Sequence, residues 1–397
     1  MGTGAWIWAR TVRGASAVKL ASMTPASSPL DAGIEEEAGA FAETVDASLR
    51  ASLSRSAEIE ADIAIHPDNY RILTGDRPTG HLHVGHYFGS LANRVRLQNA
   101  GVRTMVLIAD YQVIYDRDGV GDLQDNVFSA MADYLAAGID PDRTMIFTHS
   151  AVPGLNQLML PFLSLVTDAE LRRNPTVKDE LAASNRPMSG LMLTFPVHQA
   201  ADILFGKANL VPVGKDQLPH IELTRVIARR FDERYGRADP DHPVFPQPDA
   251  LLSPAPLILG MDGAKMSKSR GNTIEIGMSA DETARIIKRA VTDSDRHITY
   301  DPANRPEVSN LVALAALCLH RSPESVAEEI GDGGGGGLKN LLTAALNDTL
   351  APIRARRAQL LTDQGYLRTV LREGNRQANS IADQTLDEVR QAMQMIY

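Results

Sequence analysis

The stretch YRILTGDRPTGHLHVGHYFGSL, residues 70–91, decides the fold. A short apolar run is followed by a glycine-rich turn, after which Val84, Phe88, Leu91 and Val95 recur at helical spacing. This order predicts a strand followed by a helix that begins near Val84. Glycines in the turn let a ligand approach the backbone, and the positive end of the helix dipole favours a phosphate there.

Two histidines lie three residues apart in the first turn of that helix, His83 and His86. Both can face the same anion, because imidazole N–H groups donate to phosphate oxygens without a fixed charge. The glycine spacing differs from the Rossmann G-x-G-x-x-G pattern, and no Walker G-K-[ST] follows. A glycine-rich turn with incidental histidines remains the alternative for this stretch alone.

Strand and helix patterns alternate as far as about residue 277. Further strands are predicted at 104–110, 144–150, 209–214 and 256–260, and Leu123, Val127, Met131 and Tyr134 mark a helix between the first two. Such alternation predicts an α/β fold with a Rossmann-like parallel sheet, which binds ligands at the carboxyl ends of its strands. From 278 onward only helices are predicted, interrupted by a flexible hinge or loop at GDGGGGG, 331–337.

The chain therefore divides into four predicted blocks. They are a mobile extension at 1–34, an acidic helical extension at 35–68, a Rossmann-like catalytic domain at 69–277 and an all-helical C-terminal domain at 278–397. The acidic helices carry Leu49, Leu53, Ile59 and Ile63 at helical spacing, and no chemistry is assigned to them.

Composition limits the possible functions. The 397 residues contain a single cysteine, Cys318, which excludes a disulfide framework and a cysteine-based zinc site. No apolar run is long enough to span a bilayer. The net charge of −9 argues against a nucleic-acid partner, but residues 338–376 carry an excess of basic side chains. That region either meets phosphates or forms ordinary solvated helix faces.

A second stretch, GMDGAKMSKSRGN at 260–272, favours phosphate binding. It argues against the alternative that residues 70–91 form only a glycine-rich turn with incidental histidines. Lys265 and Lys268 lie three residues apart in a glycine-rich loop that follows an apolar run. Two such lysines can converge on one polyphosphate as its negative charge develops.

The two stretches together resemble the His-Ile-Gly-His and Lys-Met-Ser-Lys-Ser signatures of class I aminoacyl-tRNA synthetases. NLVPVGKDQLPHIELTRVIARRF, FPVHQAADILF and AVTDSDRHITYD extend the resemblance to the tryptophanyl-tRNA synthetases, over residues 70–397. The resemblance implies ATP-dependent attachment of L-tryptophan to tRNA(Trp) through a tryptophanyl adenylate. It also implies that residues 278–397 bind the anticodon.

The resemblance assigns roles to individual residues. His83, His86, Lys178, Lys265 and Lys268 would act in catalysis. The residues implied to bind ATP are Arg77, Pro78, Thr79, Gly85, His86, Gly214, Lys215, Asp216, Ile258, Lys265, Met266, Ser267, Lys268 and Ser269. Mg²⁺ is expected to arrive with ATP, since no carboxylate cluster marks a metal site built from protein ligands alone.

Tryptophan recognition needs a buried acceptor for the indole N–H, because an unpaired donor would be costly. Asp202 matches the acceptor of the family, and Gln217 is expected to meet the amino-acid backbone. Gln199 replaces a usual methionine, Gln112 a usual histidine, and His86 a frequent asparagine. These departures resemble divergent, auxiliary tryptophanyl enzymes and concern the indole contacts.

The resemblance further implies a cytoplasmic homodimer. Two alternatives remain open from the sequence, namely a tyrosyl-tRNA synthetase and a non-catalytic synthetase paralogue. An Asp acceptor would also suit a phenol, whereas the intact signatures argue against lost chemistry.

Overall fold

The computed structural model describes residues 50–114, 119–184, 187–236, 243–252, 258–266 and 270–397. The extension expected at 1–34 and the first part of the acidic block lie outside these ranges. Within them, no helix combines the length and the apolar character needed to cross a membrane.

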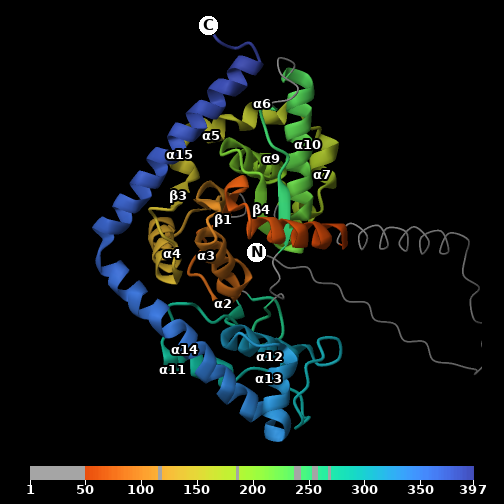
Figure 1. Cartoon of the computed structure of the whole chain (residues 1–397), viewed down its shortest axis with the longest axis vertical. Helices are drawn as coiled ribbons and strands as arrows, with labels where there is room; N and C mark the ends of the chain where they lie inside the picture. Colours follow the sequence, from red (N-terminus) through yellow and green to blue (C-terminus); the bar gives the residue numbers. More distant parts are fainter. Residues whose placement is uncertain (1–49, 115–118, 185–186, 237–242, 253–257, 267–269) are drawn as a thin grey trace, which may run out of the picture. The chain divides into compact units, whose positions relative to one another are not determined.

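The core of residues 51–397 is a five-stranded parallel sheet, as the sequence predicts. Its strands stand in the order β3-β2-β1-β4-β5 (Figure 1). Their bounds are β1 Arg71–Asp76, β2 Arg103–Ile108, β3 Thr144–Thr148, β4 Leu210–Val213 and β5 Asp249–Leu252. β2 and β3 read as almost continuous apolar runs because both faces of the sheet are covered.

The fifth strand was predicted at 256–260, and that prediction is wrong. β5 lies at Asp249–Leu252 and pairs with β4. In the described part of the predicted stretch, Leu259 makes only an isolated bridge to Lys265. An apolar run alone does not identify a strand, because a loop that packs into a core is equally apolar.

Helices cover both faces of the sheet, and alternate strand residues point to each. Val106, Ile108 and Ile146 pack with α4, Leu123–Ala137, on one face. Met105, Leu107 and Phe147 pack on the other face with α9, Gly190–Phe205, and α10, Leu218–Tyr235. The remaining helices before residue 260 are α2 Val84–His86, α3 Ala92–Asn99, α5 Pro153–Gln157, α6 Met159–Leu163, α7 Asp168–Arg173 and α8 Pro175–Ser184. Short helical turns are η1 Pro67–Asn69, η2 Tyr87–Leu91, η3 Tyr111–Val113, η4 His149–Ala151 and η5 Lys215–Gln217.

The two neighbours of β1 pair with it to different extents. β2 follows β1 along its whole length, from Arg71↔Arg103 to Asp76↔Ile108. The ladder to β4 registers only the pair Ile72↔Leu210. Beyond Ile72 the two strands diverge toward their carboxyl ends, and Pro212 in β4 has no N–H with which to continue the ladder. A gap therefore opens between β1 and β4 at the edge where parallel sheets bind ligands.

A helix at residues 50–63 precedes the sheet. Ile59 and Ile63 are buried in a small cluster with Ile72 of β1 and Leu210 of β4, whereas Leu53 is exposed. The helix thus covers the amino-terminal side of the β1–β4 junction, and the predicted helical spacing is confirmed for its second half.

From Ala280 onward the regular elements are all helices, as predicted. The helices are α11 Ala280–Lys288, α12 Pro306–Leu319, α13 Pro323–Ile330, α14 Gly334–Thr362 and α15 Gln364–Ala392, with the turn η7 Gly331–Gly333 before α14. α15 returns to the sheet and lies along β3 and α5 (Figure 1). The side chain of Asn375 accepts a hydrogen bond from Thr148 N at 3.0 Å, and Thr385 Oγ1 donates to Phe205 O at 2.7 Å.

The glycine run at 331–337 is not the flexible hinge or loop that was expected. Its first three residues form η7, and its last four form the first turn of α14. Gly331 and Gly334 have positive φ angles of 48° and 69°, which place the bend between the helices at residues without a Cβ. A Cβ on Gly335 would lie 2.9 Å from Thr292 Oγ1, so this turn packs too closely for a larger residue.

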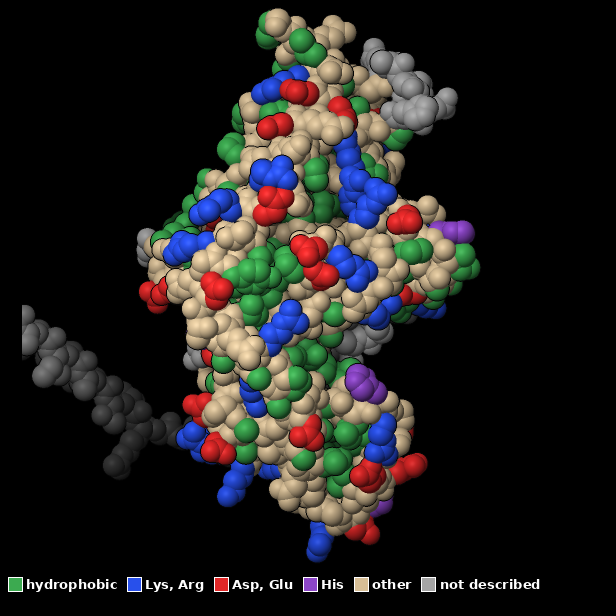
Figure 2. Space-filling model, turned by 60° about the vertical axis from the view of Figure 1, so that its left-hand side comes forward, with side chains coloured by type: hydrophobic (Ala, Val, Ile, Leu, Met, Phe, Trp, Pro, Cys, Tyr) green, Lys and Arg blue, Asp and Glu red, His purple; other side chains and the backbone are tan. Residues whose placement is uncertain are grey.

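Two arginines of the basic region at 338–376 make contacts inside the protein, whereas Arg356, Arg368, Arg372 and Arg376 are exposed. Arg357 of α14 bonds to the buried Asp133 of α4 at 2.6 Å and to Ser129 Oγ at 2.8 Å. Arg354 donates to Thr283 Oγ1 and Asn347 Oδ1, both at 2.7 Å. On the face turned forward in Figure 2, basic and acidic side chains are interspersed and form no continuous basic patch. Arg354 and Arg357 therefore hold α14 against the rest of the chain.

The closest approach of α15 to the sheet provides a test of this packing. A Cβ at Gly374 would lie 1.8 Å from Ile146 O, so Gly374→Ala must push α15 away from β3. We expect it to lower the free energy of unfolding by about 1–3 kcal/mol or more. Gly336→Ala in α14 is the matched control, because its Cβ meets nothing within 4 Å. The control should raise the free energy of unfolding by about 0.5–1 kcal/mol. If both variants change the free energy of unfolding equally in urea melts, the close packing of α15 on β3 is contradicted.

Candidate active site

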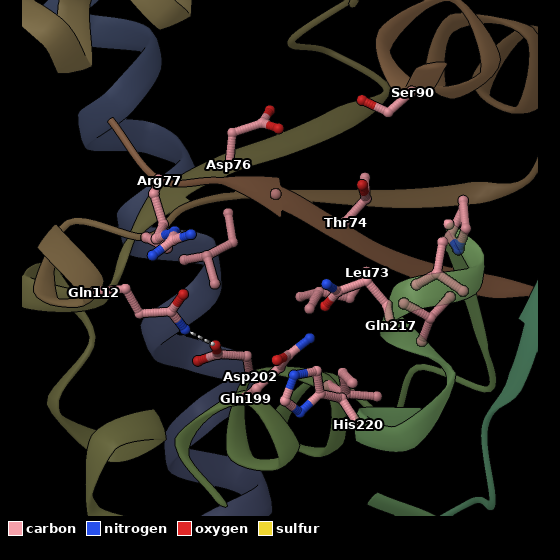
Figure 3. A pocket seen from close by; sticks show the side chains of 18 of the residues that line it. Leu73, Thr74, Asp76, Arg77, Ser90, Gln112, Gln199, Asp202, Gln217 and His220 are labelled. Carbon is pink, nitrogen blue, oxygen red and sulfur yellow. Dashed lines mark hydrogen bonds between the residues drawn. The ribbon is translucent and has the colours of Figure 1, made fainter. Parts of the chain in front are cut away.

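A cavity of about 420 Å³ occupies the gap between β1 and β4 (Figure 3). Its walls come from the carboxyl-end residues of these two strands, from α9, and from η5 with the start of α10. The residues predicted from the sequence that line it are Arg77, Thr79, His86, Gln112, Gln199, Asp202, Gly214 and Gln217. These residues are spread over 141 positions of the sequence, from Arg77 to Gln217, and the fold gathers all of them around one cavity.

The other predicted residues lie outside the lining of this cavity. Pro78 and Ile258 are buried, whereas Lys178 is exposed on α8. Lys215 and Asp216 are exposed in η5, where Gln217 Nε2 donates to Asp216 Oδ2 at 2.9 Å. Lys265 is exposed. Ser267, Lys268 and Ser269 lie outside the described residues.

The two signature stretches meet beside the cavity. Val84 N donates to Ile274 O at 2.9 Å, and Ile276 N donates to Leu82 O at 3.0 Å. A Cβ at Gly85 would lie 3.0 Å from Nδ1 of His83 and 3.2 Å from Sδ of Met266. The segment after the lysine loop thus pairs through its backbone with the histidine segment. A side chain at position 85 would crowd both His83 and Met266, so glycine suits this contact between the two signatures.

The histidine segment forms the start of a continuous helical stretch. His83 N donates to His86 Nδ1 at 3.2 Å, and the two ring centroids are 3.8 Å apart. Directly after α2 the helix widens into the π-helical turn η2, and Gly89 and Ser90 of this turn line the cavity. Such turns are frequent at functional sites, and the sequence pattern gave no sign of this one.

A buried ion pair at the end of β1 was missed by sequence reasoning. Asp76 bonds to Arg94 of α3 at 2.6 and 3.1 Å, and Tyr134 Oη donates to the same carboxylate at 2.7 Å. Burial alone would raise the pKa of Asp76, but the charge and hydrogen bonds of Arg94, with the Tyr134 hydroxyl, lower it to about 2. The carboxylate is therefore ionised at neutral pH. A charged residue directly after a buried strand was the available signal.

A second carboxylate of the cavity is also paired. Arg77 Nη2 lies 3.2 Å from Glu180 Oε1 of α8, and both side chains are partly exposed. Partly exposed pairs contribute little to stability, so a phosphate could replace Glu180 as the partner of Arg77 at small cost. Glu180 lies two positions from the predicted Lys178 and was not itself predicted.

The third carboxylate, Asp202, is 2% exposed on α9. Its Oδ1 lies 2.8 Å from His149 Nε2, and its Oδ2 lies 3.5 Å from Gln112 Nε2 (Figure 3). The ring of His198 lies 4.4 Å from that of His149, and its Nε2 donates to Asn156 Oδ1 at 2.8 Å. Sequence reasoning missed both histidines. His198 was visible in the same motif as Asp202, but His149 ends a distant strand.

His149, His198 and Asp202 also offer three potential metal ligands within 4.8 Å of one another. Ligand atoms around a tetrahedral zinc ion lie about 3.4 Å apart. The 2.8 Å separation of His149 Nε2 and Asp202 Oδ1 is a hydrogen-bond length, and His198 already bonds to Asn156. The cluster is therefore a chain of hydrogen-bonded side chains.

His220 of α10 completes the wall opposite Asp76. It is 1% exposed, packs edge-on against Phe195 at 5.1 Å, and neither ring nitrogen has a hydrogen-bond partner among the described residues. Burial lowers the pKa of this imidazole to about 4, although Asp216 and Glu180 act in the opposite direction. A neutral ring with one donor and one acceptor thus faces the cavity.

Comparisons with known proteins show which families this chain is similar to. Residues 67–351 match the family model of class I tRNA synthetases (W and Y). A tryptophan–tRNA ligase of Treponema pallidum is 42% identical over 81% of this chain and 96% of its own length. One of Clostridium longisporum is 39% identical over 82% of this chain and 97% of its own. The crystal structure of Campylobacter jejuni tryptophanyl-tRNA synthetase with ADP and tryptophan superposes with a TM-score of 0.68. It is 30% identical, over 81% of this chain and 99% of that one.

The Asp76–Arg94 pair can be tested by removing the arginine. Arg94→Met leaves a buried carboxylate without its cation and should lower the free energy of unfolding by about 3–5 kcal/mol. Arg96→Met on the same helix is the control, because its pair with Glu60 is exposed and should contribute less than about 1 kcal/mol. Similar losses for both variants in chemical denaturation would contradict the assigned role of Arg94.

His220 predicts a pH dependence of stability. The unfolded chain binds a proton on this residue below about pH 6.5, whereas the folded protein binds it only below about pH 4. Stability is therefore lost as the pH falls through this window. Between about pH 7.5 and 4.5, wild type should lose about 2–3 kcal/mol more than His220→Gln. If the difference in free energy of unfolding between wild type and His220→Gln stays constant over this pH range, His220 is not held neutral.

Proposed function

We propose a residue-level mechanism for this chain, which belongs to the family of class I tRNA synthetases for tryptophan and tyrosine and attaches tryptophan to tRNA. In the first step the tryptophan carboxylate oxygen bonds to the α-phosphorus of ATP, and pyrophosphate leaves. In the second, a hydroxyl of the terminal tRNA adenosine attacks the carbonyl carbon of the adenylate, and AMP leaves. Neither step needs a covalent bond to the enzyme, so positioning and charge stabilisation supply the rate.

The observation that carries the assignment of tryptophan is the buried carboxylate of Asp202 in the cavity wall. Its Oδ2 accepts the indole N–H, and the side chains of Gln112 and Gln199 surround the ring. Gln217 lies at the other end of the cavity lining, on η5, and binds the amino-acid backbone. An acceptor buried among Ala200, Ala201 and Ile203 penalises amino acids that lack a matching donor.

ATP is held at the N-terminal end of the helix that begins at Val84. Thr79, His86 and Gly214 line the cavity there, and Arg77 exchanges Glu180 for a phosphate oxygen. His83 and Gly85 lie at the contact between the two signatures, so the adjoining loop can reach the same phosphates. Lys265, Lys268 and Lys178 bind the departing pyrophosphate, and Pro78, Lys215, Asp216, Ile258, Met266, Ser267 and Ser269 complete the nucleotide contacts.

Mg²⁺ arrives as the ATP complex in this proposal. Each carboxylate that lines the cavity already has a partner: Arg94 for Asp76, Arg77 for Glu180 and His149 for Asp202. These residues do not fit a resident divalent ion, which needs unpaired oxygen ligands. When bound with ATP, Mg²⁺ neutralises the charge of the phosphates.

We further propose that the helical region 278–397 contacts the anticodon of tRNA(Trp) and that the protein works as a cytoplasmic homodimer. Because Arg354 and Arg357 make internal contacts, exposed residues such as Arg356 and Arg372 supply the charge that meets tRNA phosphates. The boundaries at 68/69 and 277/278 are part of this proposal.

The test is ATP–pyrophosphate exchange with each of the twenty amino acids, followed by charging of tRNA(Trp). Tryptophan should support rapid exchange, because its indole N–H matches the buried acceptor, whereas amino acids without a side-chain donor at that position should not. Exchange with tyrosine at a comparable kcat/KM would identify a tyrosyl enzyme. Absence of exchange with any amino acid, in a folded protein that binds ATP, would identify a non-catalytic paralogue.

A further inference from the structure

The side chain of His149, which lies behind the cavity, contacts the carboxylate of Asp202. His149 follows β3 in η4, and its Nε2 lies 2.8 Å from Asp202 Oδ1. His149 is 0% exposed and does not line the cavity, so it does not meet the substrate directly.

The chemistry of the pair fixes the direction of its hydrogen bond. An ionised carboxylate can only accept, so the proton of the 2.8 Å contact belongs to Nε2 of His149. Oδ1 is thereby engaged, and Oδ2 is the oxygen left for a ligand. The only other bond to the Asp202 side chain among the described residues reaches Oδ2 from Gln112, at the long distance of 3.5 Å (Figure 3).

We propose that His149 is a positioning residue for tryptophan recognition, which holds Asp202 by Oδ1 so that Oδ2 is presented to the indole N–H. This inference rests on the proposed function of Asp202. Without a donor at Oδ1 the carboxylate turns about its last side-chain bond and divides its two oxygens between Gln112 and the substrate. A buried carboxylate oxygen would also lose its partner.

His149 is itself held from several elements, as a positioning residue must be. Asn156 Nδ2 of α5 donates to His149 O at 2.7 Å. The ring of Tyr111 in η3 stacks on the imidazole, 6.3 Å away and inclined by 14°. The next residue, Ser150, bonds through its backbone N–H and its hydroxyl to Asp110. The donor therefore belongs to a rigid part of the protein rather than to a loose loop.

The decisive experiment compares His149→Leu with His149→Gln in the full-length protein. Glutamine can place an amide N–H near the position of Nε2, whereas leucine fills similar space without a donor. We measure pyrophosphate exchange with tryptophan and with the analogue in which sulfur replaces the indole N–H. His149→Leu should lower kcat/KM for tryptophan about 10-fold or more. Most of this loss should appear in the KM for tryptophan, with the KM for ATP unchanged. The sulfur analogue should change only slightly, and His149→Gln should restore most of the activity.

His198→Leu is the matched control. This side chain touches the ring of His149, but its Nε2 bonds to Asn156 and not to Asp202. It should change kcat/KM for tryptophan and the sulfur analogue by the same factor. If His149→Leu also affects both alike, or if Gln and Leu at 149 behave identically, His149 only supports the fold and the proposal is overturned.

A replacement variant and the wild-type result distinguish failure of this proposal from a folding defect and from failure of the proposed function. If His149→Leu does not fold, His149→Asn replaces it, because the shorter amide cannot reach Oδ1. The proposal then requires that His149→Asn favours tryptophan over the sulfur analogue only weakly, and that His149→Gln favours tryptophan strongly. If wild type itself shows no tryptophan-dependent exchange, the proposed function fails, whereas normal wild-type exchange with indifferent variants refutes only the role of His149.

Discussion

The cavity depends on one constraint in the sheet, which is that β1 can pair fully with only one of its neighbours. β2 follows β1 for its whole length, while the ladder to β4 registers a single residue pair. Chain connections leave these neighbours in opposite directions, and such a switch point in the strand order is where open parallel sheets bind ligands. Leu73 to Asp76 on one side and Val211 to Val213 on the other then line the cavity. α9, α10 and α3 bring further side chains to this gap.

Segments that follow the sheet in the sequence pack beside the cavity. Residues 274–276 pair with 82–84 through backbone hydrogen bonds, which brings the described part of the lysine segment against the histidine segment. α14 is joined to α4 by Arg357 and Asp133, and Ser129, which also bonds to Arg357, contacts His81 at 2.8 Å. A continuous set of contacts therefore connects the long C-terminal helix with His81, in the turn before α2.

Much of this arrangement follows from local sequence. The strand at Arg71, the helix after Val84 and the buried face of α4 are confirmed, because each depends on periodicity and turn residues within a short window. The errors have non-local causes. β5 was placed on an apolar run, whereas strand identity is decided by pairing with β4. The glycine run was expected to be loose, whereas packing against Thr292 and the apolar face that follows, beginning at Leu338, makes it helical. Arg94 and His149 could not be assigned, since their partners come from other elements of the fold.

The cavity shows why such partners are needed. A carboxylate in a low-dielectric site either loses its charge or acquires a donor, and each of the three that line this cavity has acquired one. The three donors differ in how exposed they are to solvent, and this exposure determines whether each can be exchanged for a ligand. Arg94 is buried and stays paired with Asp76, so this ion pair has a structural role. Arg77 is partly exposed and can exchange its carboxylate for a phosphate. His149 is buried but bonds to only one oxygen of Asp202, and the other oxygen has only the long 3.5 Å contact with Gln112 among the described residues. Substrate recognition therefore depends on how many lone pairs of each carboxylate the protein itself has already engaged.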